Sequence, residues 1–211
     1  MKRILKFLPI LTCLIMIAGC DPDLETADIS RVTFYPILTV PGEQWNTIKV
    51  GGSFTDPGAT AKEGDADLTV TTSGTVDVNT PGVYTITYTA VNKDGYSATD
   101  YRYVGVISAA VEGTDMSGSY KRNAGAKGVS TVTKISDNFY FADNVGGVAV
   151  TNPSLGVYFY HYDTGLLGVP FQRTPGNAFE ATNATVELGV KYSWVVINPG
   201  YGAALRTFIK Q

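Results

Sequence analysis

The stretch that decides the fold class is Val83-Tyr84-Thr85-Ile86-Thr87-Tyr88-Thr89-Ala90-Val91, where large or apolar side chains alternate with threonines. Alternation with a period of two residues is typical of a β-strand that has one buried face and one solvated face. The threonines are therefore expected to face water. The residues expected to face a core are Tyr84, Ile86, Tyr88 and Ala90.

Turn residues bound this strand on both sides. Thr80-Pro81-Gly82 precedes it, and Asn92-Lys93-Asp94-Gly95 follows it, with Gly95 placed where a turn favours a positive φ angle. Further strands are predicted over Arg31–Val40, Thr47–Val50, Leu68–Thr72 and Ala98–Ile107. Several short strands separated by turns favour a small β-sandwich.

The rest of the chain has the same character. No window shows sustained apolar periodicity of 3.6 residues, and short alternating runs are broken by many of the 23 glycines and 10 prolines. We therefore predict an all-β protein.

The N-terminus has the layout of a secretory signal. Three basic residues open the chain, and the apolar stretch Phe7–Ile17 follows, which is too short to span a bilayer comfortably. The sequence Ile17-Ala18-Gly19-Cys20 looks like a lipobox, in which the cysteine is acylated and signal peptidase II cuts before it. Residues 1–19 are thus predicted to be a signal peptide, Cys20 the lipidation site and 20–30 a solvated tether. The lipid would anchor the mature chain in a membrane.

Cysteine usage and charge exclude several classes of function. The two cysteines are Cys13, inside the signal, and Cys20, so the mature chain has no thiol for a disulfide, a redox couple or a soft-metal site. Signal removal leaves 13 of the 16 basic residues against 19 acidic ones, a formal net charge of −6. This balance argues against nucleic acid as a partner.

Three segments carry a family resemblance. Gly52-Ser53-Phe54-Thr55-Asp56-Pro57-Gly58-Ala59-Thr60-Ala61, Gly74-Thr75-Val76-Asp77 and Pro81–Ala90 together resemble the bacterial immunoglobulin-like domains of the HYR-like group. The resemblance implies an immunoglobulin-like sandwich over residues 31–108. Such domains mostly act as spacers or as partner modules beside another domain.

A second resemblance follows a linker predicted over 109–115. The segments Gly118–Arg122, Val132–Asp143 and Gly146-Gly147 are similar to C-terminal domains of unknown function in surface lipoproteins of gut Bacteroidetes, often met near Sus-like glycan-uptake systems. This likeness implies an outer-membrane, lipid-anchored protein at the cell surface. Residues 116–211 are predicted to form either an antiparallel β-sandwich or a small barrel.

Aromatic residues suggest a binding site in the second domain. Residues 111–211 hold 14 aromatic residues against 9 in 21–110, and they are nearly neutral, with 7 acidic and 8 basic side chains. If Val157 and Phe159 pack into a core, the tyrosines that alternate with them form an outward ladder with a spacing of about 7 Å. Flat aromatic faces can stack on sugar rings, although a tyrosine stripe can also simply stabilise a sheet. The candidate glycan-binding residues are Tyr158, Tyr160, Tyr162, Trp194 and Tyr201.

Catalytic chemistry finds little support. His161 is the single histidine, which argues against a metal site and against a triad, and we interpret it as a packed or edge residue. The carboxylates of the second domain fall in no recognisable catalytic setting. We predict a non-catalytic protein without a cofactor that binds a neutral glycan as an accessory of a polysaccharide-uptake system. The alternatives are a scaffold that binds an outer-membrane uptake protein and, third, a hydrolase.

Overall fold

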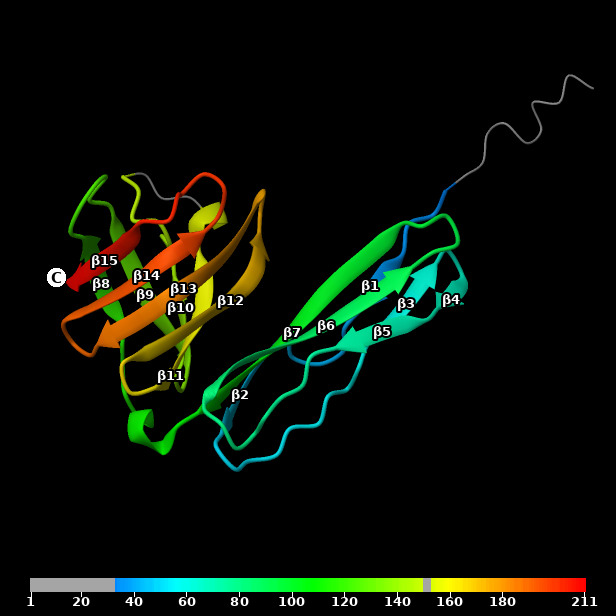
Figure 1. The fold of residues 1–211 in the computed structure, drawn as a ribbon, viewed down its shortest axis with the longest axis horizontal. Helices are drawn as coiled ribbons and strands as arrows, with labels where there is room; N and C mark the ends of the chain where they lie inside the picture. The colour runs from blue at the N-terminus through cyan, green and yellow to red at the C-terminus, as the bar shows by residue number, and fades with distance from the viewer. Residues whose placement is uncertain (1–32, 150–152) are drawn as a thin grey trace, which may run out of the picture. The chain divides into compact units, whose positions relative to one another are not determined.

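The computed structural model describes residues 33–149 and 153–211, and Tyr35–Gln211 form one compact unit (Figure 1). The predicted signal peptide, most of the predicted tether and the lipidation site Cys20 lie outside the described residues. Apart from two short 3-10 turns, the regular elements of the described chain are β-strands, so the all-β prediction is confirmed. No helix in this part of the chain is long and apolar enough to cross a membrane.

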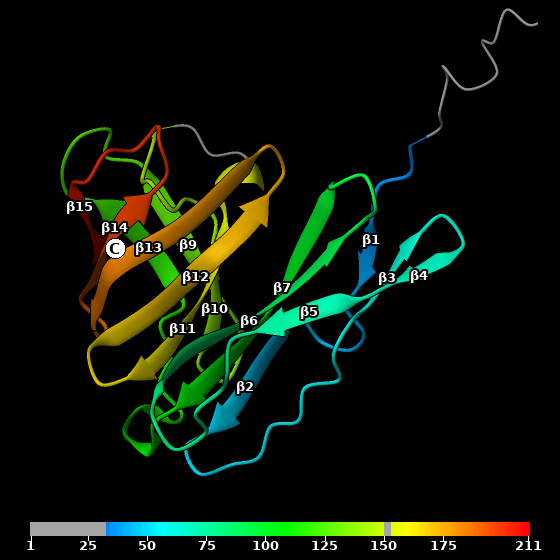
Figure 2. The ribbon, with the colours of Figure 1, turned by 45° about the vertical axis from the view of Figure 1, so that its right-hand side comes forward.

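The N-terminal domain consists of two sheets. One has the strand order β1-β3-β4 and the other β2-β7-β6-β5, with β2 parallel to β7 (Figure 2). The strands are β1 Ile37–Thr39, β2 Trp45–Lys49, β3 Thr60–Glu63, β4 Ala66–Leu68, β5 Val70–Ser73, β6 Gly82–Val91 and β7 Ser97–Ile107.

The deciding stretch forms β6 as predicted. Ile86, Tyr88 and Ala90 are buried, whereas Tyr84 is only half-buried, because it lies nearer the end of the strand and its hydroxyl donates to the Thr80 carbonyl at 2.9 Å. The turn after β6 has Gly95 at φ +86°, which confirms the positive angle expected there.

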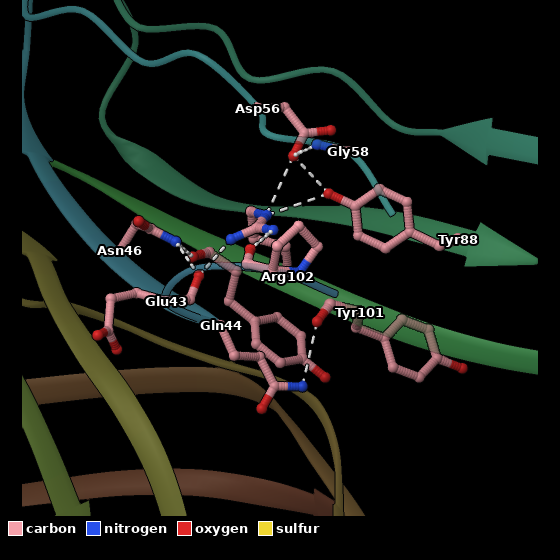
Figure 3. Close-up of polar contacts among 10 residues, drawn as sticks. Glu43, Gln44, Asn46, Asp56, Gly58, Tyr88, Tyr101 and Arg102 are labelled. Atoms are coloured by element: carbon pink, nitrogen blue, oxygen red, sulfur yellow. Dashed lines mark hydrogen bonds and ion pairs between the residues drawn. The ribbon is translucent and has the colours of Figure 1, made fainter. Parts of the chain in front are cut away.

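An ion pair between buried Arg102 and half-buried Asp56 fastens two loops of this domain (Figure 3). Arg102, only 1% exposed, lies with its Nε 3.0 Å from Asp56 Oδ1 and 3.1 Å from the Tyr88 hydroxyl, which itself donates to Asp56 at 2.5 Å. The guanidinium also donates to the Pro41 carbonyl at 2.6 Å and to the Glu43 carbonyl. The carboxylate of Asp56, in the Asp-Pro-Gly turn, is thereby paired with Arg102 and accepts a hydrogen bond from Tyr88.

Strand β7 is buried on both faces from Arg102 to Ile107. Arg102 faces the sandwich interior, while the alternate residues Tyr103 and Ile107 belong to a second cluster that includes Phe139 and Tyr160. A strand covered on both sides reads as a nearly continuous apolar run.

The C-terminal domain is a closed barrel of eight antiparallel strands (Figure 1). Each strand pairs with the next along the chain, and β15 returns to pair with β8. The structure thus decides for the barrel over the sandwich. The strands are β8 Gly118–Arg122, β9 Val129–Ser136, β10 Phe139–Ala142, β11 Val157–Asp163, β12 Leu166–Thr174, β13 Asn177–Glu187, β14 Lys191–Ile197 and β15 Leu205–Lys210.

Side chains fill the barrel. An eight-stranded barrel has an interior just wide enough for packed side chains or one small ligand. Here large aromatic residues occupy it, all at most 1% exposed: Tyr120, Tyr140, Phe159, Phe179, Tyr192, Trp194 and Phe208. A ligand would therefore have to bind on the outside of the barrel.

The connection between the domains is packed rather than free. The 3-10 turn η2, Ala109–Val111, follows Ser108, whose amide donates to the Tyr162 carbonyl at 2.8 Å. Val111 is buried, and its carbonyl accepts a hydrogen bond from the Asn138 side chain at 2.9 Å.

Candidate functional site: an aromatic cleft

Strand β11 presents the three predicted tyrosines on its outer face. Val157 and Phe159 are buried in the barrel core, as the alternation implied. Tyr158 is 36% exposed and Tyr162 is half-buried, but Tyr160 is 0% exposed. The expected open ladder is therefore interrupted at its middle residue.

Tyr160 is covered by the N-terminal domain. Its hydroxyl donates to the Asn46 carbonyl at 2.9 Å, and its ring lies so close to Gly105 that a Cβ there would be 2.4 Å from ring carbon Cδ1. Gly168 of the barrel packs equally closely against Val83, since a Cβ added at Gly168 would lie 2.2 Å from Val83 Cγ2. One glycine from each domain thus permits the two domains to approach closely. Tyr160 is therefore not accessible to a ligand.

Beside Tyr158 this contact opens into a cleft of about 330 Å³. Its walls are aromatic: the ring centroids of Trp45 and Tyr158 are 5.3 Å apart, and those of Phe141 and Tyr158 are 4.9 Å apart. Trp45 in turn stacks on buried Tyr103 at 4.1 Å. The lining residues are Gln44, Trp45, Asp100, Tyr101, Tyr103, Phe141, Gly156, Tyr158, Gln172, Arg173, Thr174 and Pro175.

Polar side chains edge this cleft. Gln44 Nε2 lies 3.3 Å from Asp100 Oδ1 and 3.1 Å from the Tyr101 carbonyl. Arg173 donates to the Thr99 carbonyl at 2.9 Å, and its guanidinium carbon is 5.7 Å from the centroid of the Tyr101 ring. Hydrogen-bond donors and acceptors are therefore both present among the lining residues, beside half-exposed aromatic rings.

Buried Gln172 fixes the position of Tyr158. Its side-chain oxygen accepts from the Tyr158 amide at 2.7 Å, and its nitrogen donates to the Tyr158 carbonyl at 2.8 Å. The backbone of the exposed ring is thus held by a side chain with no freedom of its own, which favours a preformed site.

Several buried phenols should make the fold sensitive to alkali. Burial raises the pKa of Tyr120 to about 12, and burial likewise raises the pKa values of Tyr103 and Tyr160. The pKa of each of these phenols is higher in the folded chain than the value of about 10 in the unfolded chain. Their contribution to folding stability is therefore fully present below pH 10 and is lost as the pH rises toward 12. We expect the urea midpoint to fall over this range. Constant stability between pH 9 and 11.5, with phenolate absorbance at 295 nm appearing in the folded state, would contradict the assignment.

The other two predicted site residues lie away from the cleft. Trp194 is 0% exposed in the barrel core, where its indole donates to the Val145 carbonyl at 2.8 Å, so it is not available to a ligand. Tyr201 is half-buried in the loop before β15, with the Arg206 guanidinium 5.1 Å from its ring centroid.

His161 is packed, in agreement with its interpretation. It is 2% exposed, burial lowers its pKa, and its Nδ1 lies 3.0 Å from the Thr114 hydroxyl. Within residues 33–149 and 153–211, no three His, Cys, Asp or Glu side chains are grouped so as to hold a metal ion.

The N-terminal wall of the cleft was missed from the sequence. The sequence alone places Trp45, Asp100 and Tyr101 in the predicted spacer domain and in no site. A signal did exist: Tyr101, Tyr103 and Gly105 share one face of β7, and a strand of a simple two-layer sandwich does not need large aromatic residues on its outer face.

Comparison with known proteins supports the fold. The family model described as "Bacterial surface protein, Ig-like domain" matches residues 38–106. Residues 38–106 are therefore similar to the immunoglobulin-like domains of bacterial surface proteins. The resemblance noted for the N-terminal half is thereby confirmed, and the immunoglobulin-like domain supplies β7 and one wall of the cleft.

No curated protein matches the chain. Among solved structures, the crystal structure of the lipoprotein BT2262 from Bacteroides thetaiotaomicron is similar at 21% sequence identity, with a TM-score of 0.36. The match covers 84% of this chain and 100% of that chain.

Proposed function

We propose that this protein is a non-catalytic surface lipoprotein that binds a neutral glycan in the aromatic cleft. The observation that carries the proposal is the combination of half-exposed Trp45 and Tyr101 and exposed Tyr158 with polar side chains at the edge of the same cleft. Aromatic faces pack against the apolar C–H patches of pyranose rings, and hydroxyl groups of a sugar need both donors and acceptors. The cleft offers both.

The number of carboxylates in the cleft favours a binding role over hydrolysis. Glycoside hydrolysis ordinarily requires a pair of carboxyl groups about 5 to 10 Å apart. Asp100 is the one carboxylate among the described residues that line the cleft, and its Oδ1 already accepts from Gln44 and from the Tyr101 amide. This arrangement suits a hydrogen-bond acceptor for a hydroxyl group.

The proposed location is the outer membrane, facing the cell exterior. Two features support it: the lipobox ending at Cys20 and the match of residues 38–106 to a domain of bacterial surface proteins. An accessory role beside an outer-membrane glycan-uptake system follows from the same setting. The immunoglobulin-like domain would then be part of the binding site and not only a spacer.

Affinity electrophoresis of residues 21–211 through gels that contain plant, host and microbial polysaccharides tests the proposal. We expect one neutral glycan to retard the protein. The double substitution Tyr101→Ala and Tyr158→Ala should weaken that binding at least tenfold, about 1.4 kcal/mol or more. Tyr96→Ala is the matched control, because Tyr96 is an exposed tyrosine of the same protein outside the cleft.

If the double variant is retarded as strongly as the wild type, the glycan binds outside the aromatic cleft. No retardation by any glycan would favour the scaffold alternative, which also has a structural feature in its support. A mostly apolar hollow of about 480 Å³ lies on the barrel surface and includes Phe171, Val196, Ile197 and Pro199. Co-purification of an outer-membrane uptake protein without glycan, abolished by Ile197→Lys, would establish that role.

A further inference from the structure

Two arginines lie together at one end of the barrel. Strand β8 ends at Arg122, and β15 begins one residue before Arg206, so both residues belong to the same end. In register, Arg122 is opposite Phe208, whose side chain is in the barrel core, and Arg206 is two residues before Phe208 on the same face. Diagonal neighbours of this kind are about 7 Å apart at Cβ and within reach of each other's long side chains.

Neither guanidinium has a carboxylate partner in the part of the chain that the structure describes. Arg206 is 5% exposed, and it donates to the Ala204 carbonyl at 3.0 Å and to the Tyr201 carbonyl. Arg122 donates to the Gly146 carbonyl at 3.0 Å. The Nε atoms of both arginines are buried and have no hydrogen-bond partner.

The contrast with Arg102 is informative. Arg102 is about as buried as Arg206, but the carboxylate of Asp56 lies 3.0 Å from it. Buried charges in proteins are normally paired, and a buried polar atom left unpartnered often indicates a missing ion or water. Burial and the positive charge of Arg122 both lower the pKa of Arg206, so the two side chains together favour an anion nearby.

Two glycines allow the backbone to pack closely against Arg122. A Cβ at Gly147 would lie 2.6 Å from Arg122 Cδ, and one at Gly125 would lie 3.2 Å from Arg122 Nη2. Arg122 is half-buried, so it remains reachable from solvent, and the half-buried ring of Tyr201 lies beside Arg206. The result is a pair of guanidinium groups with an aromatic ring beside one of them.

We propose that Arg122 and Arg206 form a second binding site, which takes the carboxylate group of a ligand. A planar guanidinium fork matches a carboxylate in two parallel hydrogen bonds, and two forks without internal counter-ions supply the charge. The site is separate from the aromatic cleft, since it shares none of the cleft's lining residues. It goes beyond the proposed neutral-glycan site and does not depend on it.

The two tryptophans allow each site to be followed separately. Trp194 is opposite Arg206 in register and its indole donates to the carbonyl of Val145, next to Gly146, while Trp45 lines the aromatic cleft. In a ¹⁵N-labelled sample of residues 21–211, titration with sodium galacturonate at constant ionic strength should shift the Trp194 indole resonance saturably. The Trp45 resonance should stay in place.

Arg122→Gln should abolish this shift or weaken the apparent affinity at least tenfold. Lys121→Gln is the matched control, because Lys121 is an exposed cation on the adjacent residue of the same strand. Arg206→Gln is a second test, valid if its spectrum remains that of the folded protein. Sodium acetate serves as a probe without a sugar ring.

A saturable shift with acetate as well as galacturonate supports a site that recognises the carboxylate alone. A shift with galacturonate at much lower concentration supports additional contact between the sugar ring and Tyr201. The absence of any saturable shift of Trp194 with either salt, or an unchanged shift in folded Arg122→Gln, would overturn the proposal. Glycan binding in the cleft would be read from Trp45 and is independent of either outcome.

Discussion

Replacing Asp56 with alanine is expected to lower the free energy of unfolding by about 3 to 5 kcal/mol, because Arg102 would be left as a buried charge without its counter-ion. The Tyr88 hydroxyl and the Gly58 amide would lose their acceptor in the same substitution. For a chain of this size the Tm should fall by roughly 6 to 20 °C. Urea denaturation and a thermal melt of residues 21–211 measure both quantities.

The matched control is Asp67→Ala. Asp67 also pairs with a basic residue, Lys62, but at 3.6 Å and with 87% of its own side chain exposed. Exposed ion pairs contribute about 0 to 1 kcal/mol, so this variant should unfold near the wild-type midpoint. Equal effects of the two substitutions would show that the Asp56 pair is not a stabilising element of the N-terminal domain.

Gly105→Ala should have the second large effect, on stability and on glycan binding together. Its Cβ would be 2.4 Å from the Tyr160 ring, and that ring has no room to retreat because it is fully buried and fastened to the Asn46 carbonyl. Overpacking of this kind costs about 1 to 3 kcal/mol. Since both sides of this contact contribute residues to the lining of the cleft, retardation by the glycan should fall at least tenfold.

Gly200→Ala is the control for this experiment. Its added Cβ would meet only the Asn198 side chain, at 3.4 Å, and its backbone has no positive φ angle. Lower stability with unchanged glycan affinity in Gly105→Ala would show that the cleft does not need both walls. No change in either property would mean that the contact between Gly105 and Tyr160 does not form.

Local features were predictable and distant pairings were not. The alternation of apolar and polar residues in Gly82–Val91 is enough to predict a strand. The glycine at position 95 is enough to predict the turn that follows it. The choice between a sandwich and a barrel depends instead on the pairing of Lys121 with Ile209, which are far apart along the chain. No local pattern encodes that closure.

The candidate site divides in the same way. The alternation around Tyr158 correctly separated the outer face of β11 from the core, but it gave no means of knowing that Tyr160 is covered. That cover comes from Gly105, and contact between residues so distant is visible only in three dimensions. Trp194 lies in the core because it shares the inward face of its strand with Tyr192. The sequence pattern of that strand alone does not say which of its two faces points inward.

The glycines at the contact between the domains also bear on how such a protein can evolve. A module that is joined to its neighbour only through a flexible chain can be exchanged without having to fit another surface. Here a replacement module would need a residue without a side chain at the position of Gly105 and a small enough partner for Gly168. The two halves are therefore expected to be inherited as a pair, and in a lineage with tandem copies only the copy next to the barrel should retain these constraints.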